Sequence, residues 1–173
     1  MKLLFIISVS IAVKKCPIIL KKLSDKKVHI NCIITNSAKK IIDKKIIQKC
    51  IKGKIFDDSS ERGRKMLHIT LTRKSDLVVV CPATANLIAK FSNGYADDLA
   101  STSLIASNKQ ILFMPAMNVE MWNNKINKKN NVFGSEYNQV AIIDHNNVNE
   151  LKRMTKIDVA KKLVNRIINN FEK

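Results

Sequence analysis

The chain has 173 residues, of which 46% are hydrophobic and 26% are charged, and its formal net charge is +17. This length can bury one core and this composition is too apolar for a disordered protein, so we expect one folded domain spanning residues 1–173. The charge does not indicate a specific nucleic-acid partner, because only five of the 31 basic residues are arginine and the nine aromatic residues show no RNA-stacking pattern.

The first apolar run, Leu3–Val13, has two interpretations. It is similar to the hydrophobic region of a secretory signal peptide, with the small residues Ser10 and Ala12 near its end. It also fits a buried first strand. The pattern of the remaining chain favours the strand, because the parallel sheet that this pattern predicts needs one here.

Short apolar runs then alternate with longer segments of helical periodicity, as is typical of a parallel sheet with helices on both faces. The predicted strands are Leu3–Ser8, Val28–Thr35, Asp76–Cys81, Gln110–Met114 and Val140–Ile143. The predicted helices are Ala12–Ser24, Ala38–Ile51, Ala85–Phe91, Asp97–Ala106 and Ile157–Phe171. We therefore expect a single-domain α/β protein with a Rossmann-like, flavodoxin-like parallel sheet.

Two polar stretches interrupt this alternation. Lys52–Lys65 contains glycine, serine and aspartate and is interpreted as a connecting loop. Asn123–Asn138 is similarly polar and is interpreted as a flap over the ligand site.

In an open parallel sheet, ligands bind outside the carboxyl ends of the strands. Small hydroxyl and amide side chains follow four of the predicted strands there, with few charges: Ser8, Ser10, Thr35, Asn36, Thr84, Asn86 and Asn118. Hydroxyls and helix N-terminal amides can bind phosphate without lysine or arginine. This edge therefore predicts a site for a phosphorylated, polyhydroxylated ligand.

The four cysteines are widely spaced and form no CxxC or Cys/His cluster, so we expect no metal site. Cys32 and Cys81 lie in apolar runs, which predicts buried thiols in a reducing, cytoplasmic compartment. No segment has the 18 apolar residues of a membrane span, so we expect no membrane partner.

Two motifs carry a resemblance to a known family. The first is CPATAN at 81–86, continuing to ADDL at 96–99, and the second is PAMNVEMW at 115–122. With the His68-Ile69 pair upstream, and over residues 3–154, they resemble the flavin-containing cysteine decarboxylases, above all the phosphopantothenoylcysteine decarboxylases. The resemblance implies FMN-dependent decarboxylation of 4′-phosphopantothenoylcysteine, a small thiol, to 4′-phosphopantetheine in coenzyme A biosynthesis, by a homotrimer or a multiple of trimers.

The resemblance also implies roles for particular residues. His68 matches the active-site histidine, a side chain suited to proton exchange near neutral pH. The residues that match substrate-binding positions are Ala116, Met117, Asn118, Arg153 and Met154. The residues that match FMN-binding positions are Ser8, Ser10, Ile11, Ala12, Thr35, Ala38, Pro82, Thr84, Ala85 and Asn86.

Simpler interpretations stand beside these roles. Thr84 and Asn118 are also suitable helix caps, and Trp122 is a suitable core residue. The acidic pair Asp97 and Asp98 precedes an apolar helix, which favours a helix N-terminal role over a metal or acid/base role. His29 and His145 match no family position and are interpreted as structural.

Two departures from the family pattern bear on function. Val9 stands where the family usually has glycine beside the FMN phosphate, and a β-branched residue does not easily adopt a positive φ. Asn146 stands where complete members carry the cysteine that protonates the ene-thiol product.

Three hypotheses remain: a complete decarboxylase, an oxidative decarboxylase that stops at the ene-thiol, and a non-catalytic or degenerate flavoprotein subunit. A separate phosphopantothenate-cysteine ligase is a possible partner of the first.

Overall fold

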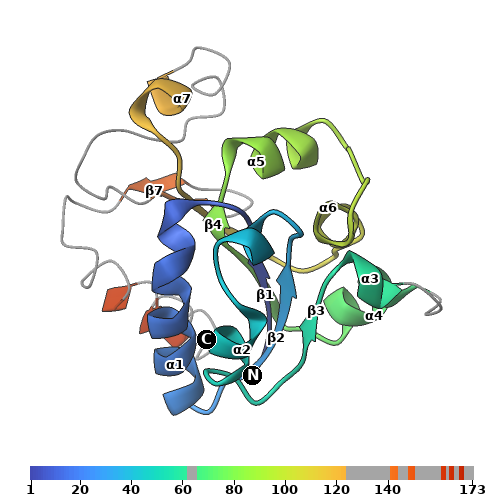
Figure 1. Ribbon diagram of the computed structural model, residues 1–173, viewed down its shortest axis with the longest axis vertical. Helices are drawn as coiled ribbons and strands as arrows, with labels where there is room; N and C mark the ends of the chain where they lie inside the picture. The colour runs from blue at the N-terminus through green and yellow to red at the C-terminus, as the bar shows by residue number, and fades with distance from the viewer. Residues whose placement is uncertain are drawn as a thin grey trace.

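The computed structural model describes residues 1–61, 66–123, 141–143, 148–150, 161–162, 164–165 and 168–169. Its centre is a five-stranded sheet with the strand order β3-β2-β1-β4-β5, in which every pairing is parallel (Figure 1). The strands are β1 Lys2–Ile7, β2 His29–Ile34, β3 Ile55–Phe56, β4 Leu77–Ala83 and β5 Ile111–Pro115. This order and direction confirm the predicted Rossmann-like parallel sheet with helices on both faces.

The sheet is buried on both faces because its inner strands are apolar at nearly every position. β1 lies at the centre, and Leu3–Ile7 are all buried, as the strand interpretation of this run predicts. Successive side chains of a strand point to opposite faces. Phe5 therefore packs in one core cluster and Leu4 and Ile6 in the other.

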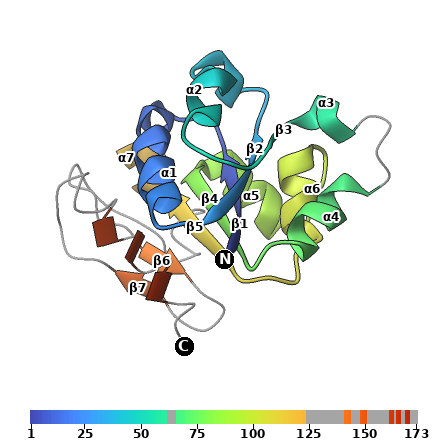
Figure 2. The same ribbon diagram turned by 90° about the horizontal axis from the view of Figure 1, so that it is seen from below.

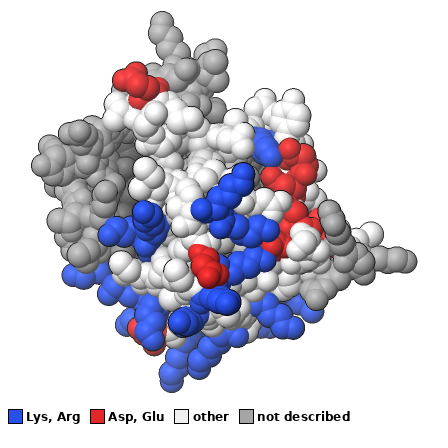
Figure 3. All heavy atoms as spheres, in the orientation of Figure 1, with Lys and Arg blue, Asp and Glu red and all other residues white. Residues whose placement is uncertain are grey.

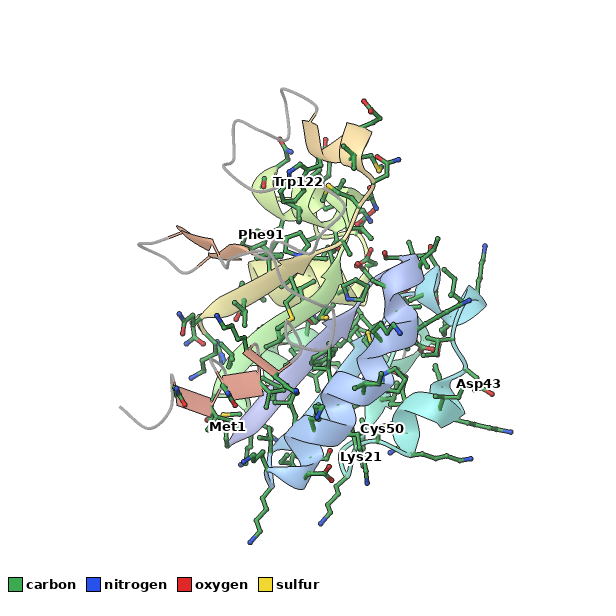
Figure 4. All side chains as sticks on the ribbon, turned by 90° about the vertical axis from the view of Figure 1, so that its left-hand side faces the viewer. Met1, Lys21, Asp43, Cys50, Phe91 and Trp122 are labelled. Carbon is green, nitrogen blue, oxygen red and sulfur yellow. The ribbon has the colours of Figure 1, made fainter. Side chains whose placement is uncertain are left out.

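Helices cover both faces of the sheet (Figures 1 and 2). One layer contains the 3-10 helix η1 Ile11–Lys15, α1 Cys16–Asp25, the 3-10 helix η2 Ala38–Lys40 and α2 Lys44–Gln48. The other contains α4 Leu67–Arg73, α5 Ala85–Ser92 and α6 Leu99–Ile105, with the short α3 Asp58–Glu61 beside it. Figure 4 shows the apolar side chains filling the space between α1 and the sheet, while Lys21 extends outward from α1.

The predicted fifth strand at Val140–Ile143 is wrong as a member of the parallel sheet. β6 Ala141–Ile143 instead pairs antiparallel with β7 Val148–Glu150 in a separate two-stranded sheet. The fifth position is taken by β3, which lies inside the segment predicted as the loop Lys52–Lys65. A strand of two residues is too short to produce a recognisable apolar run.

Gly53 explains how β3 reaches the sheet edge. A Cβ atom at this position would lie 2.0 Å from the carbonyl oxygen of Ile30, so only glycine fits. The next residue, Lys54, donates its backbone N–H to the side-chain oxygen of Asn31 at 3.0 Å. The same segment also contains α3, so the predicted loop is wrong over residues 55–56 and 58–61, and residues 62–65 lie outside the described part of the chain.

The predicted helix Ala38–Ile51 is also wrong as one continuous element. It is divided into η2 and α2, because Asp43 has an extended backbone and its side chain accepts the N–H of Lys45 at 2.8 Å. An aspartate in this conformation begins a new helix. The helix α4 is not among the predicted helices.

The other helices follow the predictions closely. Ala12–Ser24 corresponds to η1 and α1, Ala85–Phe91 to α5, and Asp97–Ala106 to α6. In the predicted helix Ile157–Phe171, the described positions are helical, and Val164 packs in the same core cluster as α1. The predicted flap beyond Asn123 lies outside the described residues.

Candidate functional site

The carboxyl ends of β1, β2, β4 and β5 lie at one edge of the sheet, because the four strands are parallel. The loops that follow them carry most of the predicted site residues. In Figure 3, the surface between α7 Val119–Asn123 and α5 carries little charge, whereas lysine and arginine gather below it, over α1 and α2. The part of the strand-end edge between α7 and α5 is thus lined mainly by uncharged side chains.

Ser8 joins the ends of β1 and β4. Its hydroxyl donates to the carbonyl oxygen of Pro82 at 2.6 Å and accepts the backbone N–H of Thr84 at 3.2 Å. Ser8 is only 3% exposed and Pro82 is also buried. Within one chain, the Ser8 hydroxyl therefore fixes the turn that leads into α5.

Two helices begin at this edge with capped N-termini. Ser10 caps η1 by accepting the N–H of Ala12 at 3.3 Å, and Thr84 caps α5 by accepting the N–H of Leu87 at 3.3 Å. Asn86, in the first turn of α5, is exposed. The capping interpretation of Thr84 is confirmed, and the uncapped N–H groups of such helix starts are suited to an anion.

Val9 does not distort the first loop. It is not one of the residues with a positive φ, and its side chain is 37% exposed. Ser10 is partly buried, whereas Ile11 is 82% exposed and Ala12 is also on the surface. The loop therefore forms with ordinary backbone angles and without glycine, and it presents apolar side chains to its surroundings.

Thr35 extends the β1–β2 pairing into the site. Its backbone N–H donates to the carbonyl oxygen of Ile7 at 3.1 Å, and its hydroxyl accepts the N–H of Ala38 at 3.3 Å. Ala38 is fully buried, so its side chain belongs to the core. Thr35 itself is partly exposed and lies directly beside the β1 end.

The PAMN segment continues the same edge. Ala116 donates its N–H to the carbonyl oxygen of Ala83 at 2.9 Å, which ties the end of β5 to the end of β4. Asn118 is exposed, and its side-chain oxygen accepts the N–H of Met121 at 2.7 Å, so it caps α7. Met117 is half-buried between them, and Trp122 is buried, as predicted for a core residue.

His68 lies on a different part of the molecule from Asn118. It occupies the first turn of α4, which packs against α6 and α3. Figures 1 and 2 both show α4 and α7 on opposite sides, with α5 and α6 between them in Figure 1. In the part of the chain that the structure describes, one copy does not bring these two predicted residues together.

The imidazole of His68 pairs with Glu61. Its Nδ1 lies 2.5 Å from Oε1 of Glu61, and the side chains are 22% and 33% exposed. The sequence analysis missed Glu61, because the pair spans seven residues across two helices that it did not predict.

A buried charged cluster occupies the β3 end of the same edge. Asp57 has a side chain only 3% exposed, and its carboxylate accepts hydrogen bonds from Lys39 at 2.8 Å and from Lys44. Burial alone would raise the pKa of Asp57, but hydrogen bonds from Lys39, Lys44 and Ser59 outweigh it and hold the pKa well below its usual range. This cluster was also missed, because its members are spread over residues 39–59.

The acidic pair Asp97 and Asp98 serves the start of α6. Asp98 accepts the N–H of Ser101 at 2.7 Å in a capping box, and Lys90 donates to both carboxylates. Burial opposes ionisation of Asp98, but the bonds from Ser101 and Lys90 lower its pKa. The helix N-terminal prediction is confirmed.

The remaining predictions concern thiols, membranes and the far end of the chain. Cys16, Cys32 and Cys81 are free and buried, and burial raises the pKa of Cys32. Within the described ranges, no helix is long and apolar enough to cross a membrane, and no three His, Cys, Asp or Glu side chains could together hold a metal ion. Asn146, Arg153 and Met154 lie outside the described residues.

The parallel sheet and its strand-end loops define a Rossmann-like α/β protein of the flavodoxin type. The family model described as Flavoprotein matches residues 1–172, and the chain belongs to this family.

Named relatives and solved structures agree with this assignment. The chain is 30% identical over 133 residues to a probable phosphopantothenoylcysteine decarboxylase of Streptococcus mutans, covering 75% of this chain and 74% of that protein. It is 33% identical over 129 residues to the coenzyme A biosynthesis bifunctional protein CoaBC of Bacillus subtilis, covering 73% of this chain and 32% of that protein. The chain therefore spans about a third of the length of the bifunctional relatives.

A solved PPC decarboxylase variant complexed with pantothenoylaminoethenethiol has the same fold. It superposes with a TM-score of 0.77 at 20% identity, and the match covers 99% of this chain and 98% of that one. At this level of identity the comparison establishes the fold.

Proposed function

We propose that this chain binds FMN at the strand-end edge and decarboxylates 4′-phosphopantothenoylcysteine to 4′-phosphopantetheine, a step of coenzyme A biosynthesis in the cytoplasm. The observation that carries the proposal is the joining of the PATAN and PAMN segments at the ends of β1, β4 and β5, in a chain of the Flavoprotein family. The relative named as a probable phosphopantothenoylcysteine decarboxylase and the relative named as a coenzyme A biosynthesis bifunctional protein support the substrate class.

The residues at this edge fit a flavin phosphate. The starts of η1 and α5 offer backbone N–H groups to an anion, and Ser10, Thr35 and Thr84 are only partly buried. Exposed apolar side chains such as Ile11 and Met121 suit the flat ring system. When bound, FMN supplies the two-electron oxidation of the cysteinyl thiol that makes loss of carbon dioxide possible.

The chain's own residues position the substrate and move its protons. The Asn118 amide can hold a carboxylate without adding a charge, and its cap on α7 fixes the direction of the side chain. His68 exchanges a proton with the substrate. Ser8 contributes indirectly, because it fixes the turn that positions Thr84 and the start of α5.

The separation of α4 from α7 supports assembly of the site from more than one copy. A homotrimer, or a multiple of trimers, would place His68 of one copy beside Asn118 of the next. Ile11, Met66 and Met121, which are 82%, 64% and 48% exposed, would lose solvent contact in such an assembly. A phosphopantothenate-cysteine ligase would supply the substrate.

A second candidate function is oxidative decarboxylation that ends at the ene-thiol. Asn146 favours it, because an amide has no acidic proton to give where complete family members carry a thiol. The third candidate is a flavoprotein that binds FMN without turnover.

One experiment separates the three. Purified protein is loaded with FMN and mixed anaerobically with 4′-phosphopantothenoylcysteine, and the flavin spectrum and product masses are recorded. We expect 4′-phosphopantetheine with reoxidised flavin. Ene-thiol with reduced flavin would establish the second candidate, and an unchanged substrate the third.

His68→Asn should retain FMN and lose product formation, and retained activity would remove His68 from its assigned role.

A further inference from the structure

The pair formed by His68 and Glu61 has a chemical consequence for the histidine. A carboxylate can only accept a hydrogen bond, and its oxygen lies 2.5 Å from Nδ1 of the imidazole. The hydrogen between them must therefore belong to Nδ1. In the neutral ring, Nε2 is then the atom with the free lone pair.

We propose that Glu61 is a positioning residue that holds His68 in the Nδ1–H tautomer and leaves Nε2 as the proton acceptor for the bound substrate. The proposal rests on the proposed function for its use in catalysis. The tautomer itself depends only on the pair.

Glu61 is held by its surroundings. It ends α3, whose first residue, Asp58, accepts the backbone N–H of Leu99 at 2.9 Å and the side-chain amide of Asn36 at 2.5 Å. Asp57 fixes the same turn, because its carboxylate accepts the N–H of Ser59 at 3.1 Å. The carboxylate of Glu61 is thus attached to a helix that is tied to α6 and to the loop after β2.

His68 is also held in position, because its helix α4 is anchored. Leu67 and Leu71 anchor α4 in the core, and Thr72 donates its hydroxyl to the carbonyl oxygen of His68 at 3.1 Å. With 22% of its side chain exposed, the imidazole remains accessible to a ligand while Nδ1 is engaged. Both partners therefore sit on anchored elements, as a catalytic histidine and its orienting carboxylate require.

The test reads the tautomer directly. Protein labelled with ¹⁵N-histidine is examined by long-range ¹H–¹⁵N spectra, with and without FMN, at a pH at which the imidazoles are neutral. The His68 signals are identified by their loss in His68→Asn. We expect a protonated Nδ1 and an unprotonated Nε2 in the unmodified chain. Glu61→Ala should convert His68 to a mixture of tautomers or to the Nε2–H form.

Two further variants sharpen the result. Glu61→Gln keeps an oxygen that can accept from Nδ1–H, so it should retain much of the original pattern. Asp25→Ala removes an exposed carboxylate at the end of α1, paired only loosely with Lys21 at 3.6 Å, and should leave the His68 signals unchanged. In single-turnover oxidation of the substrate, Glu61→Ala should be at least about tenfold slower than Asp25→Ala at equal FMN loading.

An Nε2–H tautomer in the unmodified chain, or no change in Glu61→Ala, would overturn the proposal. If the expected tautomer is present and the unmodified chain turns over no substrate, the decarboxylase proposal fails while the positioning of His68 is supported. Equal oxidation rates for Glu61→Ala and Asp25→Ala would overturn the role of Glu61 in the reaction.

Discussion

The two ends of the strand-end edge are built from different chemistry. At the β1–β4 end, Ser8 connects neutral loops through the Pro82 carbonyl and the Thr84 amide, and exposed residues surround it. At the β3 end, Asp57 is buried between Lys39 and Lys44. The charged groups at the β3 end therefore stabilise the fold, whereas the neutral loops at the β1–β4 end are accessible to a ligand.

Replacement of Asp57 should have the largest effect on stability. Asp57→Ala removes the carboxylate that accepts hydrogen bonds from Lys39, Lys44 and Ser59, and a hydrogen bond to a charged group contributes about 1.5–3 kcal/mol. The unfolding midpoint in urea should therefore fall strongly, whereas FMN affinity of the remaining folded protein should change little. Asp25→Ala is the matched surface control. If the free energy of FMN binding falls as much as the free energy of unfolding, the charged end also contributes to the FMN site and the proposed division of roles is wrong.

Low pH should remove the contribution of Asp57 to the free energy of unfolding. The pKa of Asp57 is lowered in the folded state, so the stability it contributes is present above the ordinary carboxylate value of about 4 and is lost as the pH falls below it. The free energy of unfolding of the unmodified chain should decrease more steeply between neutral pH and pH 3 than that of Asp57→Asn. If the free energies of unfolding of the two proteins fall equally with pH, Asp57 contributes no pH-dependent stability.

Removal of the Ser8 hydroxyl should lower both the stability of the chain and its affinity for FMN. Ser8→Ala leaves the Pro82 carbonyl and the Thr84 N–H without this partner in a buried place, at a cost of about 1–3 kcal/mol. Because the turn before α5 is released, FMN affinity measured by fluorescence should fall as well. Unchanged FMN affinity, with reduced stability, would make Ser8 a residue of the fold alone.

The smallest effect is expected at Val9. Its φ is not positive, so Val9→Gly relieves no strain and instead raises the entropy of the unfolded chain. The variant should be less stable by about 0.4–1 kcal/mol in thermal unfolding, with FMN affinity nearly unchanged. A clear increase in affinity would show that the valine side chain obstructs the phosphate.

The sequence predicted the elements whose signal is local. The apolar runs of β1 and β4 and the capping residues Thr84 and Asp98 were found because each depends on a few adjacent residues. β3 was missed because two residues are too few to form a recognisable apolar run, and their pairing with β2 depends on the close approach of Gly53 to Ile30.

The candidate site also contains features that the sequence predicts and features that it does not. The strand-end loops were predicted, because parallel strands bring their carboxyl ends to one edge. The pairs of His68 with Glu61 and of Asp57 with Lys39 depend on how separate elements pack, so spacing in the sequence does not show them. The distance between α4 and α7 is likewise a property of the folded chain.

The central claim is that the neutral end of the edge holds FMN. A fluorescence titration of FMN with the purified chain tests it most directly. We predict saturable binding of one FMN per chain, weakened in Thr84→Ala through loss of the α5 cap and unaffected in Asp25→Ala. Fluorescence that never changes as protein is added, or binding that is indifferent to Thr84, would contradict it.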